Sequence, residues 1–259
     1  MGRPVLKREK DFSGCAAQGK RERQEDFYAF FPVNANTTLA VLADGMGGHA
    51  GGADAAEISV KEFISSFSAS CDESTIPQLS TDMLHAANCA LAAKIREDNS
   101  LTGMGCTLIA TLLHNDTLHW ISVGDSLLYI FMDEQLQKIN ADHSLGGLLD
   151  QAVMEGKISS EDAKINSQRH ALRSALMGED IALVDENSIA WDGAAPPIIV
   201  VASDGLLTLT QDEIADCLHS MRQQTASDIT AALVAKTESR GAPHQDNVTV
   251  LAIKPPPSP

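Results

Sequence analysis

Two apolar segments that each end in Asp-Gly constrain this chain more than any other feature. Residues 41–48 read Val-Leu-Ala-Asp-Gly-Met-Gly-Gly, and residues 198–205 read Ile-Ile-Val-Val-Ala-Ser-Asp-Gly. Each pattern predicts a buried strand that delivers a carboxylate to its end, followed by a turn where glycine lets the backbone approach a ligand closely. Because strand ends sit on a rigid scaffold, we expect Asp44 and Asp204 to meet at one edge of a sheet.

The length of 259 residues fits one large domain or two small ones, and such a chain can bury a sizeable core. Its five cysteines are scattered, odd in number and without CxxC spacing, which favours a reducing compartment over a disulfide framework or zinc knuckle. The N-terminus does not resemble a signal peptide, and no apolar run approaches the roughly 20 residues of a membrane span. We therefore expect a cytoplasmic protein with no membrane contact.

The chain is acidic, with 35 Asp and Glu residues against 19 Lys and Arg residues and a formal charge of −16. Proteins that bind nucleic acid or anionic membranes through phosphate attraction have the opposite balance, so no nucleic-acid partner is expected. Solubility explains most of this charge, and carboxylates gathered to hold cations explain a smaller share.

Hydrophobic periodicity predicts strand groups separated by helix pairs. Three strands follow one another at 106–113, 117–123 and 127–132, and because short turns join them we expect them to pair antiparallel in succession. The other predicted strands are 27–31, 38–43, 198–202 and 248–253, and the predicted helices include 56–67, 80–97, 211–222 and 226–240. Antiparallel strands with paired helices indicate two stacked sheets flanked by helices.

Residues 145–180 differ in character from the segments around them. They are rich in Leu, Ala and Glu, which predicts short helices with a cap near Ser159, placed as an insertion over an edge of the core. Residues 1–10 are expected to form a loose or edge segment. The Pro-rich tail at 255–259 cannot continue a sheet and is expected to be disordered.

Five aspartates stand where a strand meets a turn, namely Asp26, Asp44, Asp125, Asp204 and Asp246. Carboxylates brought together repel one another unless cations lie between them, and Mg²⁺ and Mn²⁺ prefer such oxygen ligands. Two ions about 3.5–4 Å apart can share a water, lower its pKa and clamp the oxygens of a phosphoryl group in transfer. The guanidinium of Arg21, five residues before Asp26, is suited to fork onto a phosphate.

Each of these features is weak when taken alone. An isolated Asp-Gly is usually a simple turn, and a Gly-rich segment without Lys-Ser/Thr is not a P-loop. A single arginine in a charged run usually belongs to a solvated face, and His49 and His143 are more often structural than catalytic. The functional interpretation depends on the features occurring together in one chain.

Seven short motifs occur in order along the chain: Arg21-x-x-Gln-Glu-Asp26, Asp44-Gly-Met-Gly-Gly-His49, Gly105-Cys-Thr107, Gly124-Asp-Ser126, Asp142-His-Ser144, Ser203-Asp-Gly205 and Asp246-Asn247. Across residues 12–253 this set resembles the bacterial branch of the metal-dependent serine/threonine protein phosphatases, the PPM or type 2C family. The resemblance implies an α+β fold of four layers, an α-β-β-α sandwich in which helix pairs flank two stacked antiparallel sheets. It also implies a single phosphatase catalytic domain at 1–259, with a small helical flap at about 145–180 and a two-metal cleft at one end.

The resemblance further implies which residues hold the cations, two Mn²⁺ or Mg²⁺ ions. Asp44 would bridge both ions. Asp204 and Asp246 would complete one ion, and Asp26 and the carbonyl of Gly45 would serve the other.

Other positions match family features outside this pair of ions. Asp125, together with Asp204, matches the positions that hold a weaker third ion in bacterial members. Arg21 matches the phosphate-binding arginine of the family. The flap, which includes Arg169 and Arg173, matches a variable segment that influences substrate choice.

Two positions depart from the family pattern. Leu127 follows Gly-Asp-Ser, where members commonly have arginine, and this change bears on the surroundings of a third ion. Met46 stands where eukaryotic members have a histidine that is a candidate acid for the leaving group. His49 is a nearby but uncertain candidate for that acid, and a metal-bound water is the alternative.

Our hypothesis is a protein phosphatase that hydrolyses phosphoserine and phosphothreonine by direct attack of a metal-bridging hydroxide. Its expected partners are phosphoprotein substrates and an opposing Ser/Thr kinase, and we expect a monomer. The first alternative is a catalytically weak regulatory or scaffold domain with the same fold, which only Leu127 favours. The second is another metal phosphoesterase that acts on small phosphate esters or nucleotides.

Overall fold

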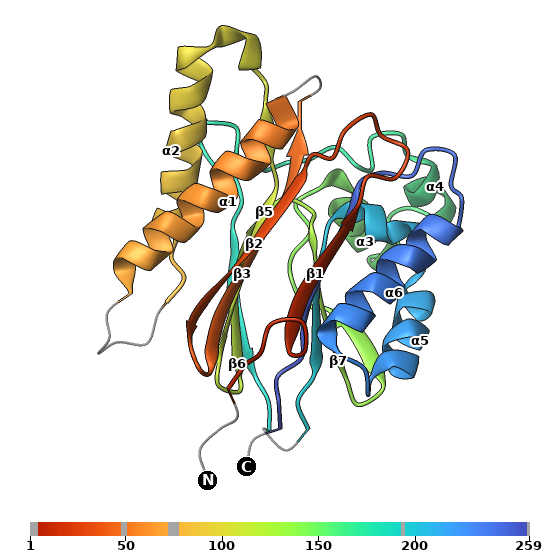
Figure 1. Cartoon of the computed structure of the whole chain (residues 1–259). Coiled ribbons are helices and arrows are strands. Elements are labelled where there is room, and N and C mark those ends of the chain that lie inside the picture. Colours follow the sequence, from red (N-terminus) through yellow and green to blue (C-terminus); the bar gives the residue numbers. More distant parts are fainter. Residues whose placement is uncertain (1–4, 48–50, 72–77, 193–194, 258–259) are drawn as a thin grey trace.

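The computed structural model describes residues 5–47, 51–71, 78–192 and 195–257. Two antiparallel sheets lie face to face, and helices cover the outer face of each sheet (Figure 1). This arrangement confirms the predicted α+β sandwich of four layers.

The two sheets contain strands drawn from both halves of the chain. The five-stranded sheet has the order β1-β11-β10-β7-β8, made of β1 (Phe12–Ala17), β7 (Leu127–Met132), β8 (Gln135–Lys138), β10 (Ile198–Ala202) and β11 (Val248–Ile253). The six-stranded sheet has the order β2-β3-β5-β6-β9, with β4 paired to β3, and is made of β2 (Asp26–Asn34), β3 (Thr37–Met46), β4 (Gly105–Cys106), β5 (Leu108–His114), β6 (Thr117–Val123) and β9 (Asp185–Ala190).

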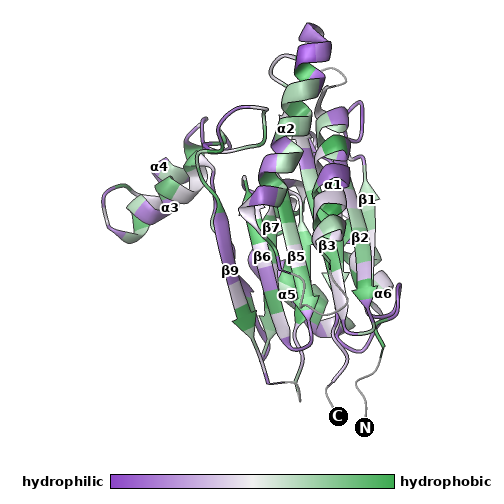
Figure 2. Cartoon of the chain, turned by 90° about the vertical axis from the view of Figure 1, so that its left-hand side faces the viewer, coloured by the Kyte–Doolittle hydropathy of each residue, from purple (hydrophilic) through white to green (hydrophobic). Residues whose placement is uncertain are grey.

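The helices form two pairs on the sheets and a third, smaller pair in the flap. α1 (Gly51–Ser70) and α2 (Thr81–Glu97) pack on the six-stranded sheet, and α5 (Gln211–Met221) and α6 (Ala226–Ser239) pack on the five-stranded sheet. The flap carries α3 (Leu145–Met154) and α4 (Ser160–Ile165), and Figure 2 shows both projecting beyond β9, away from the two sheets. The predicted cap is confirmed, since the Ser159 hydroxyl accepts a hydrogen bond from the Asp162 amide at 3.0 Å. Two short 3-10 helices, η1 (Asn99–Leu101) and η2 (Asp204–Thr208), complete the described elements.

None of the helices in the described ranges combines the length and the apolar character that crossing a membrane requires.

The alternation of side chains along β3 determines where Asp44 points. Val41 and Ala43 pack against the core beneath α1 and α2, whereas Ala40 and Leu42 pack between the two sheets. Successive strand residues face opposite sides, so Asp44 lies on the same face as Leu42. Burial of both faces of β3 explains the continuous apolar run in the sequence. The alternation of side chains places the Asp44 carboxylate between the sheets, at one end of them.

One predicted pairing is wrong. β5 and β6 pair antiparallel through the predicted turn at residues 115–116, but β6 and β7 lie in different sheets: β6 pairs with β5 and β9, while β7 pairs with β10 and β8. Gly124 between them has φ +106°, and an added Cβ would lie 2.5 Å from Cγ2 of Thr107. This conformation, which only glycine adopts easily, lets the chain pass from one sheet to the other and leaves Asp125 at the crossing.

Three strands were not predicted from the sequence. β1 contains small residues around Gly14, β8 is a four-residue strand, and β9 (Asp185–Ala190) is largely polar. Pro255, at the start of the tail predicted to be disordered, is buried. Residues 258 and 259 lie outside the described residues, so the disorder of the tail stays a prediction.

The core between the sheets gives a stability prediction. Leu42 is 0% exposed, and its truncation in Leu42→Ala should lower the free energy of unfolding by about 2–5 kcal/mol, because a cavity forms where the sheets meet. Leu207 is 51% exposed, so Leu207→Ala should cost no more than about 0.5 kcal/mol. Denaturant unfolding of both variants measures the difference, and equal losses would contradict this account of the core.

Candidate metal centre

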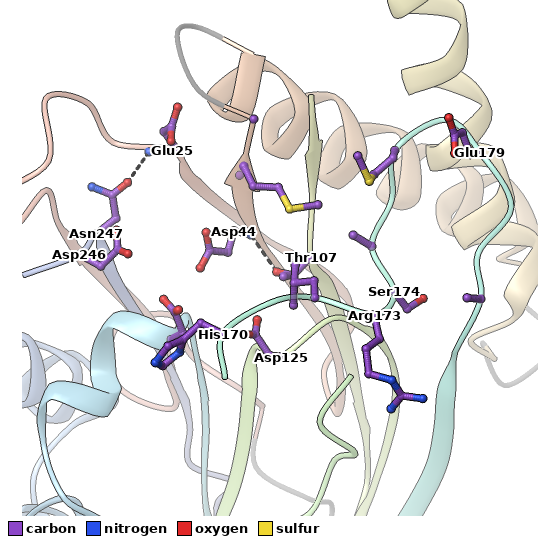
Figure 3. Close-up of a pocket in the computed structure, with 18 of the residues that line it drawn as sticks. Glu25, Asp44, Thr107, Asp125, His170, Arg173, Ser174, Glu179, Asp246 and Asn247 are labelled. Carbon is purple, nitrogen blue, oxygen red and sulfur yellow. Dashed lines mark hydrogen bonds between the residues drawn. The ribbon is translucent and has the colours of Figure 1, made fainter. Parts of the chain in front are cut away.

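A cavity of about 870 Å³ opens at one end of the two sheets. Asp44 lies near the end of β3, Asp204 follows β10, Asp246 precedes β11 and Asp125 lies between β6 and β7, so antiparallel pairing brings all four to the same end. All four line the cavity together with Arg21, as does Gly45. Figure 3 shows Asp44, Asp125 and Asp246 on different sides of this space. Six of the candidate residues, Arg21, Asp44, Gly45, Asp125, Asp204 and Asp246, thus share one cavity, and their roles there stay predictions.

Asp26 lies behind this lining, directly opposite Asp44. The two residues are register partners in the β2–β3 pair, so their Cβ atoms lie on one face of the sheet at about 4.5–5.5 Å. Asp26 is 9% exposed, and its Oδ2 accepts a hydrogen bond from the Ser203 hydroxyl at 2.8 Å. Its Oδ1 is buried without a well-formed hydrogen bond in the described structure, although the Thr249 hydroxyl lies near this carboxyl.

Burial and mutual repulsion raise the pKa of these carboxyls. Burial is the largest cause in each case. It raises the pKa of Asp26 to about 6 and of Asp125 to about 7, and with help from neighbouring aspartates it raises the pKa of Asp44 well above its usual value. The pKa of Asp204 is raised by burial and by the charge of Asp246, and its carboxyl interacts directly with that of Asp44. Such a group of acids is electrostatically unfavourable without a positive charge among them.

The donor set fits hard divalent cations. Carboxylate oxygens converge on one cavity, and one buried oxygen of Asp26 lacks a good partner. As the side chains stand, the described residues contain no group of three or more His, Cys, Asp or Glu gathered tightly enough to hold one ion. Two of the carboxylates have other partners in the structure: Arg21 Nη2 donates to Asp246 Oδ2 at 2.5 Å, and the Ser203 hydroxyl donates to Asp26 Oδ2. The Arg21–Asp246 pair is largely exposed and therefore weak, so a cation can displace it at little cost.

Asn247 fixes the loop that carries Arg21. Its Oδ1 accepts from the Glu25 amide at 2.7 Å, and its Nδ2 donates to the carbonyls of Gln18 and Arg23 at 2.8 Å each (Figure 3 draws the bond to Glu25). The sequence marked Asp246-Asn247 as a motif but gave the asparagine no role. Its role is to hold the loop between β1 and β2 against the start of β11.

Thr107 fixes the end of β3. Its hydroxyl accepts from the Asp44 amide at 3.1 Å and lies 2.7 Å from the Ser126 hydroxyl, and its own amide donates to the Asp44 carbonyl at 2.9 Å (Figure 3). Thr107 therefore links the strand end at Asp44 to the turn beside Asp125. This contact accounts for the Gly105-Cys-Thr107 motif.

Gly45 is required by the protein's own backbone. An added Cβ would lie 2.2 Å from the carbonyl oxygen of Gly52 and 2.7 Å from that of Glu25. The sequence predicted that glycine here allows close approach of a ligand. The structure shows that the close approach is made by the first turn of α1 and by the chain before β2.

The flap contributes one wall of the cavity. His170 and Arg173 line it, along with Leu172, and His170 was not predicted from the sequence (Figure 3). Arg169 instead donates to Asp150 at 2.6 Å within the flap and does not line the cavity.

The two departures from the family pattern have different outcomes in the structure. Met46 lines the cavity, and His49, the uncertain acid, lies outside the described residues. Leu127 is buried in the core beneath α5 and α6 and does not line the cavity. Its side chain is therefore accounted for by packing.

Comparison with known proteins agrees with this geometry. A family model described as Protein phosphatase 2C matches residues 14–245. The chain is 28% identical over 238 residues to the serine/threonine phosphatase stp of Listeria monocytogenes, which covers 90% of this chain and 91% of that protein. It is 31% identical over 222 residues to the serine/threonine protein phosphatase PstP of Mycobacterium tuberculosis, covering 85% of this chain and 40% of that longer protein. A crystal structure of the catalytic domain of PstP in complex with two manganese ions superposes with a TM-score of 0.72, at 25% identity and 94% and 96% coverage.

The raised pKa values predict how stability depends on pH when chelator keeps cations away. The folded protein binds protons on Asp26 and Asp125 up to about pH 6 and 7, whereas the unfolded chain releases them near 3.8, so stability should fall as pH rises from about 4 to about 7. Asp125→Asn removes one of these charges and should stabilise the chelated protein at pH 8 by on the order of 1–4 kcal/mol. Denaturant unfolding between pH 5 and 8 measures both effects, with Asp216→Asn on the exposed side of α5 as control. A pH dependence unchanged by Asp125→Asn would contradict this electrostatic account.

Proposed function

The chain belongs to the protein phosphatase 2C family, and from this membership we propose that it hydrolyses phosphoserine and phosphothreonine in proteins with the help of divalent cations. The observation that carries this proposal is the convergence of Asp44, Asp125, Asp204 and Asp246 with Arg21 on one cavity. Relatives that match about nine tenths of the chain are named serine/threonine phosphatases. An opposing kinase, a cytoplasmic location and a monomeric state remain predictions.

Residues from both sheets would hold the cations. We assign one ion to Asp204 and Asp246, the other to Asp26 and the Gly45 carbonyl, and the bridging position to Asp44. Mn²⁺ or Mg²⁺ fits this oxygen-only set, and the manganese complex of PstP supports Mn²⁺. When bound, two such ions lower the pKa of a shared water and neutralise charge on the phosphoryl oxygens.

Asp125 has a separate place in this proposal. It lies at the crossing between β6 and β7, and its pKa is raised by burial and then by the charge of Asp204. A third, weaker cation between Asp125 and Asp204 would relieve that repulsion.

Arg21 would bind the substrate phosphate. Its guanidinium stands at the mouth of the cavity on the loop held by Asn247, and it offers a planar pair of donors to phosphate oxygens. In the structure one of these donors, Nη2, donates to Asp246 instead. A cation on Asp246 competes with the guanidinium for the same carboxylate, so loading the cation would release Arg21 toward the phosphate.

The alternative of a catalytically weak scaffold domain loses its support. Leu127 was the feature that favoured it, and this side chain belongs to the core beneath α5 and α6. The alternative of a small-ester phosphoesterase is separated from the main proposal by the choice of substrate in the experiment that follows.

Phosphate release from phosphoserine, phosphothreonine and phosphotyrosine peptides tests the proposed function. We expect turnover of the first two with Mn²⁺ and none in chelator, because the carboxylates cannot activate water without cations. Asp44→Asn should lower kcat/KM by about a hundredfold or more, while Asp216→Asn should leave it unchanged. Full activity in chelator, or activity confined to a small ester such as p-nitrophenyl phosphate, would overturn the proposal.

The role of Arg21 predicts a binding defect. Arg21→Ala should raise KM for a phosphopeptide by about tenfold or more, the factor that a loss of 1.4 kcal/mol produces. Arg23→Ala is the matched control, since Arg23 is exposed in the same loop and only its carbonyl is held by Asn247. Steady-state kinetics at saturating Mn²⁺ compare the two variants, and equal KM values would show that Arg21 does not bind the phosphate.

A further inference from the structure

His143 lies between the turn that carries Asp125 and the flap. The Asp142-His143-Ser144 segment leads from β8 into α3, and it has no part in the chemistry proposed above. The His143 side chain is buried, with the residue 5% exposed. A buried histidine with bonds on two sides requires a structural explanation.

On one side, His143 holds Gly124 by two hydrogen bonds. The His143 amide donates to the Gly124 carbonyl at 3.1 Å, and the Gly124 amide donates to His143 Nδ1 at 3.2 Å. An Nδ1 atom that accepts is unprotonated, so the ring is neutral with its proton on Nε2. Burial lowers the pKa of His143, which agrees with a neutral ring. Gly124 directly precedes Asp125, so these bonds restrain the position of the backbone that carries the Asp125 side chain.

On the other side, the same segment holds the flap. The Arg173 amide donates to the His143 carbonyl at 2.8 Å, Ser144 and Leu172 form an antiparallel bridge, and the Leu145 amide donates to the Ala171 carbonyl at 2.9 Å. Leu172 and Arg173 both line the cavity. We call residues 171–176 the flap wall.

The far end of the flap wall is also fixed to the site. The amides and carbonyls of Cys106 and Leu176 exchange two hydrogen bonds of 3.0 and 2.9 Å. Cys106 precedes Thr107, which bonds the Asp44 backbone. The flap wall is therefore a short, bent segment that is fixed beside Asp125 at one end and beside Asp44 at the other.

From this geometry we propose that His143 is a positioning residue that couples the flap wall to the turn carrying Asp125. A cation bound by Asp125 would restrict the motion of the adjacent Gly124. The hydrogen bonds of His143 would extend this restriction to residues 171–173. A substrate protein that presses on the flap wall shifts Asp125 by the same connection, because such coupling is reciprocal. The inference rests on the proposed function only in that Asp125 helps to bind a cation.

Two substitutions to amide side chains test whether the coupling needs a hydrogen-bond acceptor at the position of Nδ1 or only a polar side chain at residue 143. In His143→Asn, the side-chain oxygen is attached to Cγ as Nδ1 is, so it can accept from the Gly124 amide. In His143→Gln, the oxygen lies one atom further out, near the place of Nε2. Both variants keep an uncharged polar side chain, and thermal unfolding checks that both fold.

Hydrogen–deuterium exchange of the full chain, with Mn²⁺ and with chelator, reads the coupling without measuring activity. We expect Mn²⁺ to slow exchange of the amides in 171–176 by about fivefold or more in the wild type and in His143→Asn. His143→Gln should lose this protection and should need a higher Mn²⁺ concentration for half-maximal phosphate release. Retained protection in His143→Gln, lost protection in His143→Asn, or no protection in the wild type would each overturn the proposal. Protection in a wild type that lacks phosphatase activity would overturn the proposed function and leave the role of His143 standing.

Discussion

The repulsion between buried carboxylates is the constraint on which the site depends. Asp26 and Asp44 are placed opposite each other by strand register, and the apolar core between the sheets prevents them from moving apart. Like charges in such a pair destabilise the sheet that holds them. The fold tolerates this cost at one end because Leu42 and the rest of the core between the sheets stabilise the strands behind it. A cation changes the sign of that local electrostatic energy.

Hydrogen bonds from uncharged side chains keep the carboxylates in place while that repulsion acts. The Ser203 hydroxyl, at the end of β10 in one sheet, donates to Asp26 on β2 in the other sheet. Thr107 accepts a hydrogen bond from the Asp44 amide, and Asn247 accepts one from the Glu25 amide just before Asp26. Each bond joins segments far apart in the sequence. The positions of the acids therefore depend on the packing of both sheets, and Ser203, Thr107 and Asn247 transmit that packing to the acids through their hydrogen bonds.

Much of the fold and site could be predicted from the sequence, and the failures have physical causes. Apolar periodicity located β10 and β11 because burial on both faces leaves an unbroken hydrophobic run. It did not locate β9, where four of the six residues are polar. It also could not show that β6 and β7 belong to different sheets, because a short turn is equally compatible with pairing and with crossing. The acids could be identified because their strand-end positions are local features. The parts played by His143 and Asn247 depend on contacts between distant segments, which one sequence does not reveal.

The crossing at Gly124 has a consequence for how the molecule holds together. Asp26, Asp44 and Gly45 belong to the layer that α1 and α2 cover, and Asp204 and Asp246 belong to the layer that α5 and α6 cover. An ion coordinated by residues of both groups would cross-link the two layers, at the end where the chain passes from one sheet to the other. Loading with cation would then make the two layers melt as one cooperative unit, and depletion would let each layer loosen on its own.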